Sequence, residues 1–272
     1  MLQRRFLQVD VFGARPYEGN PVAVVVDGEG LSTEQMQRFA AWTNLSETTF
    51  LLPPTDPAAD YRVRIFTPGA ELPFAGHPTL GSAHAWLASG GRTGADVLVQ
   101  ECGIGLVELR RTGDRWAFAA PDLRRYERPD DATLARAAAA LGLAPGDVLD
   151  ACWLDNGPPW LALRLGSARA VLDVRPGDLG DLYLGVVAAP GTDGADLEVR
   201  AFVEDVGEDP VTGSLNAGLA RWLTDTGVLT TPYVAAQGTA LGRAGRVHVT
   251  AADDALWVGG AATTAIAGSV AL

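Results

Sequence analysis

The sequence repeats itself after half its length. The segment that begins at Glu71 and the segment that begins at Glu208 share Glu, Pro and Gly at equivalent places. Other pairs follow in the same order: Arg64 and Arg200, Phe66 and Phe202, Gly81 and Gly218, Trp86 and Trp222, Gln100 and Gln237, Gly105 and Gly242. Chance matches among common residues are the alternative. The collinear order across 272 residues favours one duplication rather than a short-period solenoid.

Each half combines alternating, strand-like segments with an apolar helix, which predicts an α+β fold of two pseudo-symmetric domains, each with a mostly antiparallel sheet around its helix. We expect an N-terminal domain over residues 1–121 and a C-terminal domain over 122–272. The last strand, about 262–272, is a candidate to complete the first sheet. Pro78 is expected at the first helical position of the first principal helix. Ser214 is expected to cap the equivalent helix in the second half.

The composition excludes several kinds of chemistry. All 21 basic residues are arginine, so a Schiff-base lysine and a P-loop lysine are both impossible. A net charge of −12 argues against nucleic-acid and anionic-membrane surfaces. Two Cys and three His, without metal-binding spacing, predict no metal site. With no long apolar run and no signal-peptide pattern, we expect a cytoplasmic protein.

The two equivalent helix starts are the first candidate site. Gly76-His77 and Gly213-Ser214 would each present backbone N–H groups and the positive end of a helix dipole. If related halves face each other across a cleft, both starts would point into it and hold a substrate carboxylate or a developing enolate. Ordinary helix starts with no ligand are the alternative.

Glu47 makes the two halves unequal. It precedes the apolar run Phe50-Leu51-Leu52, and its counterpart in the second half is Tyr183. A carboxylate beside such a run is suited to general acid/base catalysis, although an exposed turn residue is the alternative. His77, Asp209 and Ser214 complete the candidate set.

Each of these three residues also has a simpler interpretation: His77 as a structural histidine, Asp209 as a turn former before Pro210, and Ser214 as a cap. His84 and His248 are expected to be structural. Neither Cys102 nor Cys152 lies at a helix start, which disfavours a two-cysteine racemase.

Four ordered motifs resemble the PhzF-like phenazine biosynthesis family across essentially the whole chain. They are Asp10 to Val24 with its Gly19-Asn20-Pro21 turn, Asn44 to Phe50, Pro73 to Thr79, and Glu208 to Ser214. The tail from Gln237 through Val258-Gly259-Gly260 is similar as well. One departure is Pro78, where many members of the family have Ala. The resemblance implies a diaminopimelate epimerase-like fold and a cofactor-independent isomerase, usually a homodimer.

The resemblance also implies residue roles. Glu47 matches the general acid/base, His77, Asp209 and Ser214 match substrate-binding residues, Gly76 and Gly213 match backbone donors to a carboxylate, and Asn20 is expected to line the site. The function this predicts is a proton shift within a small carboxylate substrate, similar to trans-2,3-dihydro-3-hydroxyanthranilate isomerase. An amino-acid epimerase or racemase and a non-catalytic ligand-binding homologue stay open as alternatives.

Overall fold

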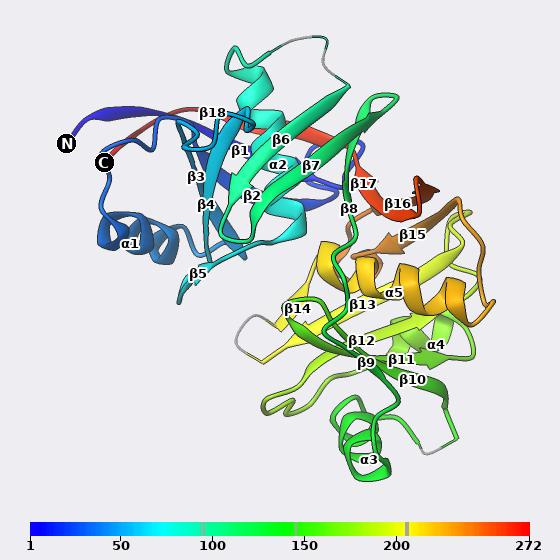
Figure 1. The fold of residues 1–272 in the computed structure, drawn as a ribbon. Coiled ribbons are helices and arrows are strands. Elements are labelled where there is room, and N and C mark those ends of the chain that lie inside the picture. Colours follow the sequence, from blue (N-terminus) through cyan, green and yellow to red (C-terminus); the bar gives the residue numbers. More distant parts are fainter. Residues whose placement is uncertain (93, 95, 145, 205–206) are drawn as a thin grey trace. The chain divides into compact units, whose positions relative to one another are not determined.

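A computed structural model describes residues 1–92, 94, 96–144, 146–204 and 207–272. The chain forms two compact units (Figure 1), Met1–Ala119 with Gly259–Leu272, and Ala120–Val258. The sequence placed the junction after residue 121, and the structure divides the chain at Ala119 and again at Val258. The C-terminal segment therefore belongs to the first unit.

In its described residues, the first unit is a mixed sheet with two helices. Its elements are β1 (Gln3–Val11), β2 (Asn20–Val25), α1 (Thr33–Thr43), β3 (Glu47–Leu52), β4 (Tyr61–Phe66), β5 (Glu71–Leu72), α2 (Gly76–Ala88), β6 (Val97–Cys102), β7 (Gly105–Thr112), β8 (Arg115–Ala119) and β18 (Ala262–Ala271). Strand β1 pairs antiparallel with both β2 and β18, and the β1–β18 ladder runs from Gln3–Ala271 to Val11–Ala262. The C-terminal strand thus completes the sheet of the first unit.

The second unit repeats the plan. Its elements are β9 (Arg125–Glu127), α3 (Asp131–Ala140), β10 (Val148–Asp155), β11 (Pro159–Leu165), α4 (Ala168–Asp173), β12 (Tyr183–Ala188), β13 (Leu197–Val203), β14 (Gly207–Asp209), α5 (Gly213–Asp225), β15 (Tyr233–Gln237), the 3₁₀ turn η1 (Thr239–Leu241), β16 (Gly245–Ala252) and β17 (Ala255–Gly260), whose last residues cross into the first unit.

Strand pairing makes the repeat visible. In the first unit β2–β3 and β4–β6 are parallel and β3–β4 is antiparallel. In the second unit β11–β12 and β13–β15 are parallel and β12–β13 is antiparallel. Strand β18 pairs with β1 as β9 pairs with β10. The two units therefore share one strand-pairing scheme, which is what a duplication of the chain would produce.

The principal helices α2 and α5 are buried along most of their length, as apolar helices packed against a sheet should be. A Cβ added to Gly81 in α2 would lie 2.3 Å from Val22 Cγ1, and one added to Gly218 in α5 would lie 2.8 Å from Leu154 Cβ. Both glycines let a helix approach a strand closely, which gives a physical reason for their match in the repeat.

The predicted ends of the helices were confirmed for α1 and were wrong at the starts of α2 and α5. Helix α1 begins with the predicted capping box between Ser32 and Gln35 and ends at Thr43 as expected. Helix α2 begins at Gly76, so Pro78 occupies the third helical position rather than the first. Helix α5 begins at Gly213, with Thr212 at the N-cap and Ser214 one residue inside the helix, so the prediction that Ser214 caps it was wrong.

We predict that Gly81→Ala lowers the free energy of unfolding by about 1–3 kcal/mol, because the added methyl group overpacks the contact between α2 and β2. Chemical denaturation measures this change. Gly69→Ala is the control, since a Cβ there meets nothing within 4 Å. Equal stability of the two variants would contradict the close packing of α2.

Candidate active site

In the first unit the predicted residues Glu47, His77 and Asn20 lie together. Glu47 is the first residue of β3 and is paired with Val22 of β2. His77 is the second residue of α2, and its Nε2 atom lies 3.3 Å from Glu47 Oε2. The amide Nδ2 of Asn20 lies 3.5 Å from His77 Nδ1. The first residues of β2 and β3 thus both contact the imidazole of His77 in the first turn of α2.

The His77 imidazole is uncharged. Burial lowers the pKa of His77 to about 3, and a hydrogen bond with the backbone of Pro21 opposes this shift only in part. The contact between His77 and Glu47 is therefore a polar contact of a neutral ring with a carboxyl group, not an ion pair. A neutral imidazole can present Nε2 as a donor or as an acceptor, depending on its tautomer.

Gly76 begins α2 directly before His77, and Ala75 at the N-cap makes no side-chain hydrogen bond. The first backbone N–H groups of α2 are therefore not capped by that side chain, and Pro78 has no N–H. Gly76 and His77 are the predicted donor positions on this helix. Their local geometry fits the binding of an anionic group.

In the second unit Asp209, Thr212, Gly213 and Ser214 form a continuous segment from the end of β14 into α5. The N-cap Thr212 also makes no capping bond, because its hydroxyl donates to Asp209 Oδ2 at 2.5 Å. Helix α5 therefore starts as α2 does, with no side-chain cap.

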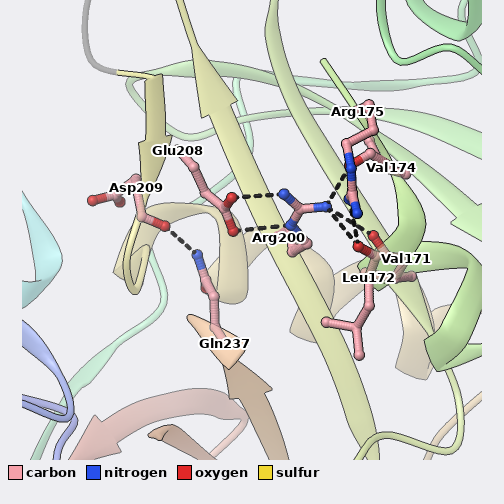
Figure 2. Close-up of polar contacts among 8 residues, drawn as sticks. All are labelled: Val171, Leu172, Val174, Arg175, Arg200, Glu208, Asp209 and Gln237. Atoms are coloured by element: carbon pink, nitrogen blue, oxygen red, sulfur yellow. Dashed lines mark hydrogen bonds and ion pairs between the residues drawn. The ribbon is translucent and has the colours of Figure 1, made fainter. Parts of the chain in front are cut away.

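The side chain of Gln237, at the end of β15, makes hydrogen bonds to this segment. Its Oε1 accepts from the Thr212 backbone N–H at 3.1 Å and from Asn216 Nδ2 at 2.8 Å. Its Nε2 donates to Thr212 Oγ1 at 3.0 Å and to the Asp209 carbonyl at 3.2 Å, the contact drawn in Figure 2. Gln237 is fully buried, so these bonds fix the approach to the helix.

A buried arginine anchors β14 from its other side. Arg200 on β13 makes a bidentate contact with Glu208, at 2.9 and 2.7 Å, and donates to carbonyls at the end of α4 (Figure 2). Arg64 and Glu71 form the equivalent pair in the first unit. The Arg and Glu matches of the repeat are thus one ion pair used twice, beside each helix start.

Ser214 is held by two residues that the sequence analysis did not select. Trp160 Nε1 donates to Ser214 Oγ at 2.9 Å, and Asn156 Nδ2 donates to the Ser214 carbonyl at 2.8 Å. Asn156 occupies the repeat position of Asn20, which was a usable signal. Trp160 has no such signal, because its contact depends on tertiary packing.

The comparisons place the chain in a family. A family model for phenazine biosynthesis-like protein matches residues 9–268. The chain belongs to this family. A trans-2,3-dihydro-3-hydroxyanthranilate isomerase from Pseudomonas aeruginosa is 36% identical over 91% of the chain and 90% of its own length. Antisense-enhancing sequence 1 from Schizosaccharomyces pombe is 37% identical over 98% of the chain and 99% of its own length.

A solved structure of a predicted epimerase from Pseudomonas aeruginosa has the same fold, with a TM-score of 0.83 and 31% identity over 98% of this chain and 99% of that one. This confirms the predicted α+β fold class. The names of several relatives confirm the prediction of an isomerase. The roles expected for individual residues remain predictions.

The pKa of His77 leads to a prediction about stability. The imidazole stays neutral in the folded protein down to about pH 3, whereas the unfolded chain takes up a proton near pH 6.5. The unfolded state binds more protons in this window. The contribution of His77 to the free energy of unfolding is therefore fully present above pH 6.5 and is lost as the pH drops toward 3. We expect His77→Gln to remove a slope of roughly 1 kcal/mol per pH unit.

Denaturation of the wild type and of both His variants between pH 7 and 4 measures this slope. His84→Gln is the comparison variant, because burial lowers the pKa of His84 less than that of His77, so its loss should flatten the slope less. Parallel curves for the wild type and His77→Gln would contradict a neutral, buried His77.

Proposed function

We propose that the protein is a cofactor-independent isomerase that moves a proton within a small carboxylate-bearing substrate, with Glu47 as the general acid/base. The observation that carries the proposal is the contact of Glu47 with a neutral imidazole at an uncapped helix start. The substrate class is suggested by the relative named trans-2,3-dihydro-3-hydroxyanthranilate isomerase.

The neutral His77 suits a carboxyl group that changes its protonation state. In the tautomer with the proton on Nε2, His77 accepts from Asn20 at Nδ1 and donates to the Glu47 carboxylate, the form that removes the proton. The imidazole keeps this proton and stays uncharged while Glu47 gains and loses its own, so it does not compete as a base. Glu47 takes the proton from one substrate carbon and returns it to another.

Helix dipoles and backbone donors supply the remaining electrostatics. Gly76 in α2 and Gly213 in α5 begin helices without a side-chain cap, and we propose both as donors to anionic oxygen atoms of the substrate. Asn20, His77, Asp209 and Ser214 are proposed to bind and orient the substrate. The proposal needs neither a metal nor a cofactor, and it retains the homodimer and the cytoplasm as predictions from the sequence.

The second unit offers a chemical contrast. Tyr183 starts β12 and pairs with Trp160 as Glu47 starts β3 and pairs with Val22. The duplicated position thus holds a carboxyl group in one unit and a phenol in the other. A single carboxyl base fits return of the proton by the same group that removed it.

An epimerase is the second candidate, because the matched solved structure is named a predicted epimerase. Inversion of a stereocentre without a shift of a double bond would favour it, and optical rotation together with the ultraviolet spectrum of the product separates the two reactions. A ligand-binding homologue without catalysis would bind the carboxylate and leave every substrate proton in place.

We predict that Glu47→Gln lowers kcat for trans-2,3-dihydro-3-hydroxyanthranilate by roughly 10²- to 10⁴-fold, because the amide cannot carry the proton. Ligand affinity and thermal stability should change little. Exposed Glu29→Gln is the matched control and should retain full activity. Turnover of Glu47→Gln at the wild-type rate would refute the assignment of Glu47.

A further inference from the structure

We propose that Trp160 is a positioning residue that fixes the direction of the Ser214 hydroxyl, so that Ser214 donates its proton to an acceptor oxygen of the substrate. The inference rests on the proposed function in one respect, that the protein binds a small carboxylate. Trp160 would be the residue that makes the Ser214 hydroxyl a hydrogen-bond donor at the first turn of α5.

The indole of Trp160 has one polar hydrogen and no acceptor, and it donates that hydrogen to Ser214 Oγ at 2.9 Å. Because an indole N–H can only donate, the direction of this hydrogen bond is fixed. Trp160 is 3% exposed, and its ring packs edge-to-face against Tyr183 with 5.5 Å between the ring centroids. The same two residues are paired across the β11–β12 ladder.

A serine hydroxyl has one proton to donate and two lone pairs. The indole engages a lone pair of Ser214, which turns the hydroxyl proton away from Trp160. Asn156 Nδ2 donates to the Ser214 carbonyl at 2.8 Å and so fixes the main chain that carries the hydroxyl. Among the described residues, the Ser214 hydroxyl donates no hydrogen bond.

The hydroxyl is thus set to donate, beside the first N–H groups of α5 at Gly213 and Ser214. Donors of this kind match an acceptor oxygen, such as one of a carboxylate or of an enolate that forms during proton transfer. The arrangement therefore places a hydrogen-bond donor where an acceptor oxygen of the substrate would bind.

Among the described residues, this hydrogen bond from an indole to a serine hydroxyl occurs in the second unit and has no equivalent in the first. The ladder position of Trp160 corresponds to Val22 in the first unit, since Val22 pairs with Glu47 as Trp160 pairs with Tyr183. A valine side chain cannot donate a hydrogen bond. Where the first unit has a carboxyl group facing His77, the second has an indole facing Ser214.

A double-mutant cycle with anthranilate as the probe tests the inference, with dissociation constants measured by calorimetry at pH 7. Trp160→Phe keeps most of the ring packing and deletes the donor, and we expect it to weaken binding about 3- to 10-fold. Ser214→Ala should weaken binding at least as much. In the Ser214→Ala background, Trp160→Phe should change the dissociation constant less than 2-fold.

Trp257→Phe is the matched control. Trp257 is a buried tryptophan of the same unit, and its indole donates to the Ala252 carbonyl at 3.2 Å. Its loss should lower stability without weakening anthranilate binding. A similar effect of Trp160→Phe in both Ser214 backgrounds, or no effect at all, would overturn the inference. Failure of the wild type to bind anthranilate would overturn the ligand class on which it rests.

A second readout needs no ligand. The indole ¹⁵N–¹H resonance of Trp160, assigned by its loss in Trp160→Phe, should shift in Ser214→Ala and stay in place in Trp257→Phe. An unchanged resonance would overturn the hydrogen bond itself. Because both experiments measure binding or structure, they stay interpretable if Glu47→Gln retains turnover, and that result would refute only the proposed reaction.

Discussion

Close burial of one helix in each sheet determines where polar chemistry can occur in this protein. Helices α2 and α5 pack so tightly that Gly81 and Gly218 have no room for a side chain. Neither helix has a side-chain cap at its start. Backbone N–H groups that the helix cannot pair are left at that end. Each unit thus has a helix start whose local geometry suits an anionic group without a basic side chain, which matters in a chain that has no lysine.

Around these helix starts the two units diverge at equivalent ladder positions. The first unit has Glu47 beside a neutral His77, and the second has Tyr183 packed on the Trp160 that donates to Ser214. The structural parts are retained in both, including the Arg–Glu pairs at Arg64 and Arg200. Duplication thus explains the shared scaffold. The residues that differ between equivalent positions of the two units are the ones suited to an asymmetric reaction.

Much of this could be predicted from the sequence. The repeat predicted the shared plan of the units, because glycine and proline at fixed spacing report backbone constraints directly. The first turn of each principal helix was harder to place. Thr212 rather than Ser214 is the N-cap, since Gln237 and Asp209 hold the Thr212 side chain and backbone. Those partners are distant in sequence or depend on strand pairing.

The candidate site shows the same limit. Glu47 and His77 could be selected one by one, but their 3.3 Å contact depends on how β3 packs against α2. The uncharged state of His77 depends on complete burial, which no local pattern reveals. Trp160 was missed for a similar reason, because a tryptophan in an apolar strand is ordinarily part of the core and its indole contact requires the folded chain.

The most direct test of the account is the fate of the migrating proton. The wild-type protein is incubated with trans-2,3-dihydro-3-hydroxyanthranilate in D₂O, and the product is analysed by mass spectrometry and ¹H NMR. Because a carboxyl group in contact with solvent exchanges its proton, the account predicts one solvent deuterium at the carbon that receives the proton. Turnover of Glu47→Gln in D₂O at the wild-type rate and with the same deuterium content would contradict transfer through Glu47.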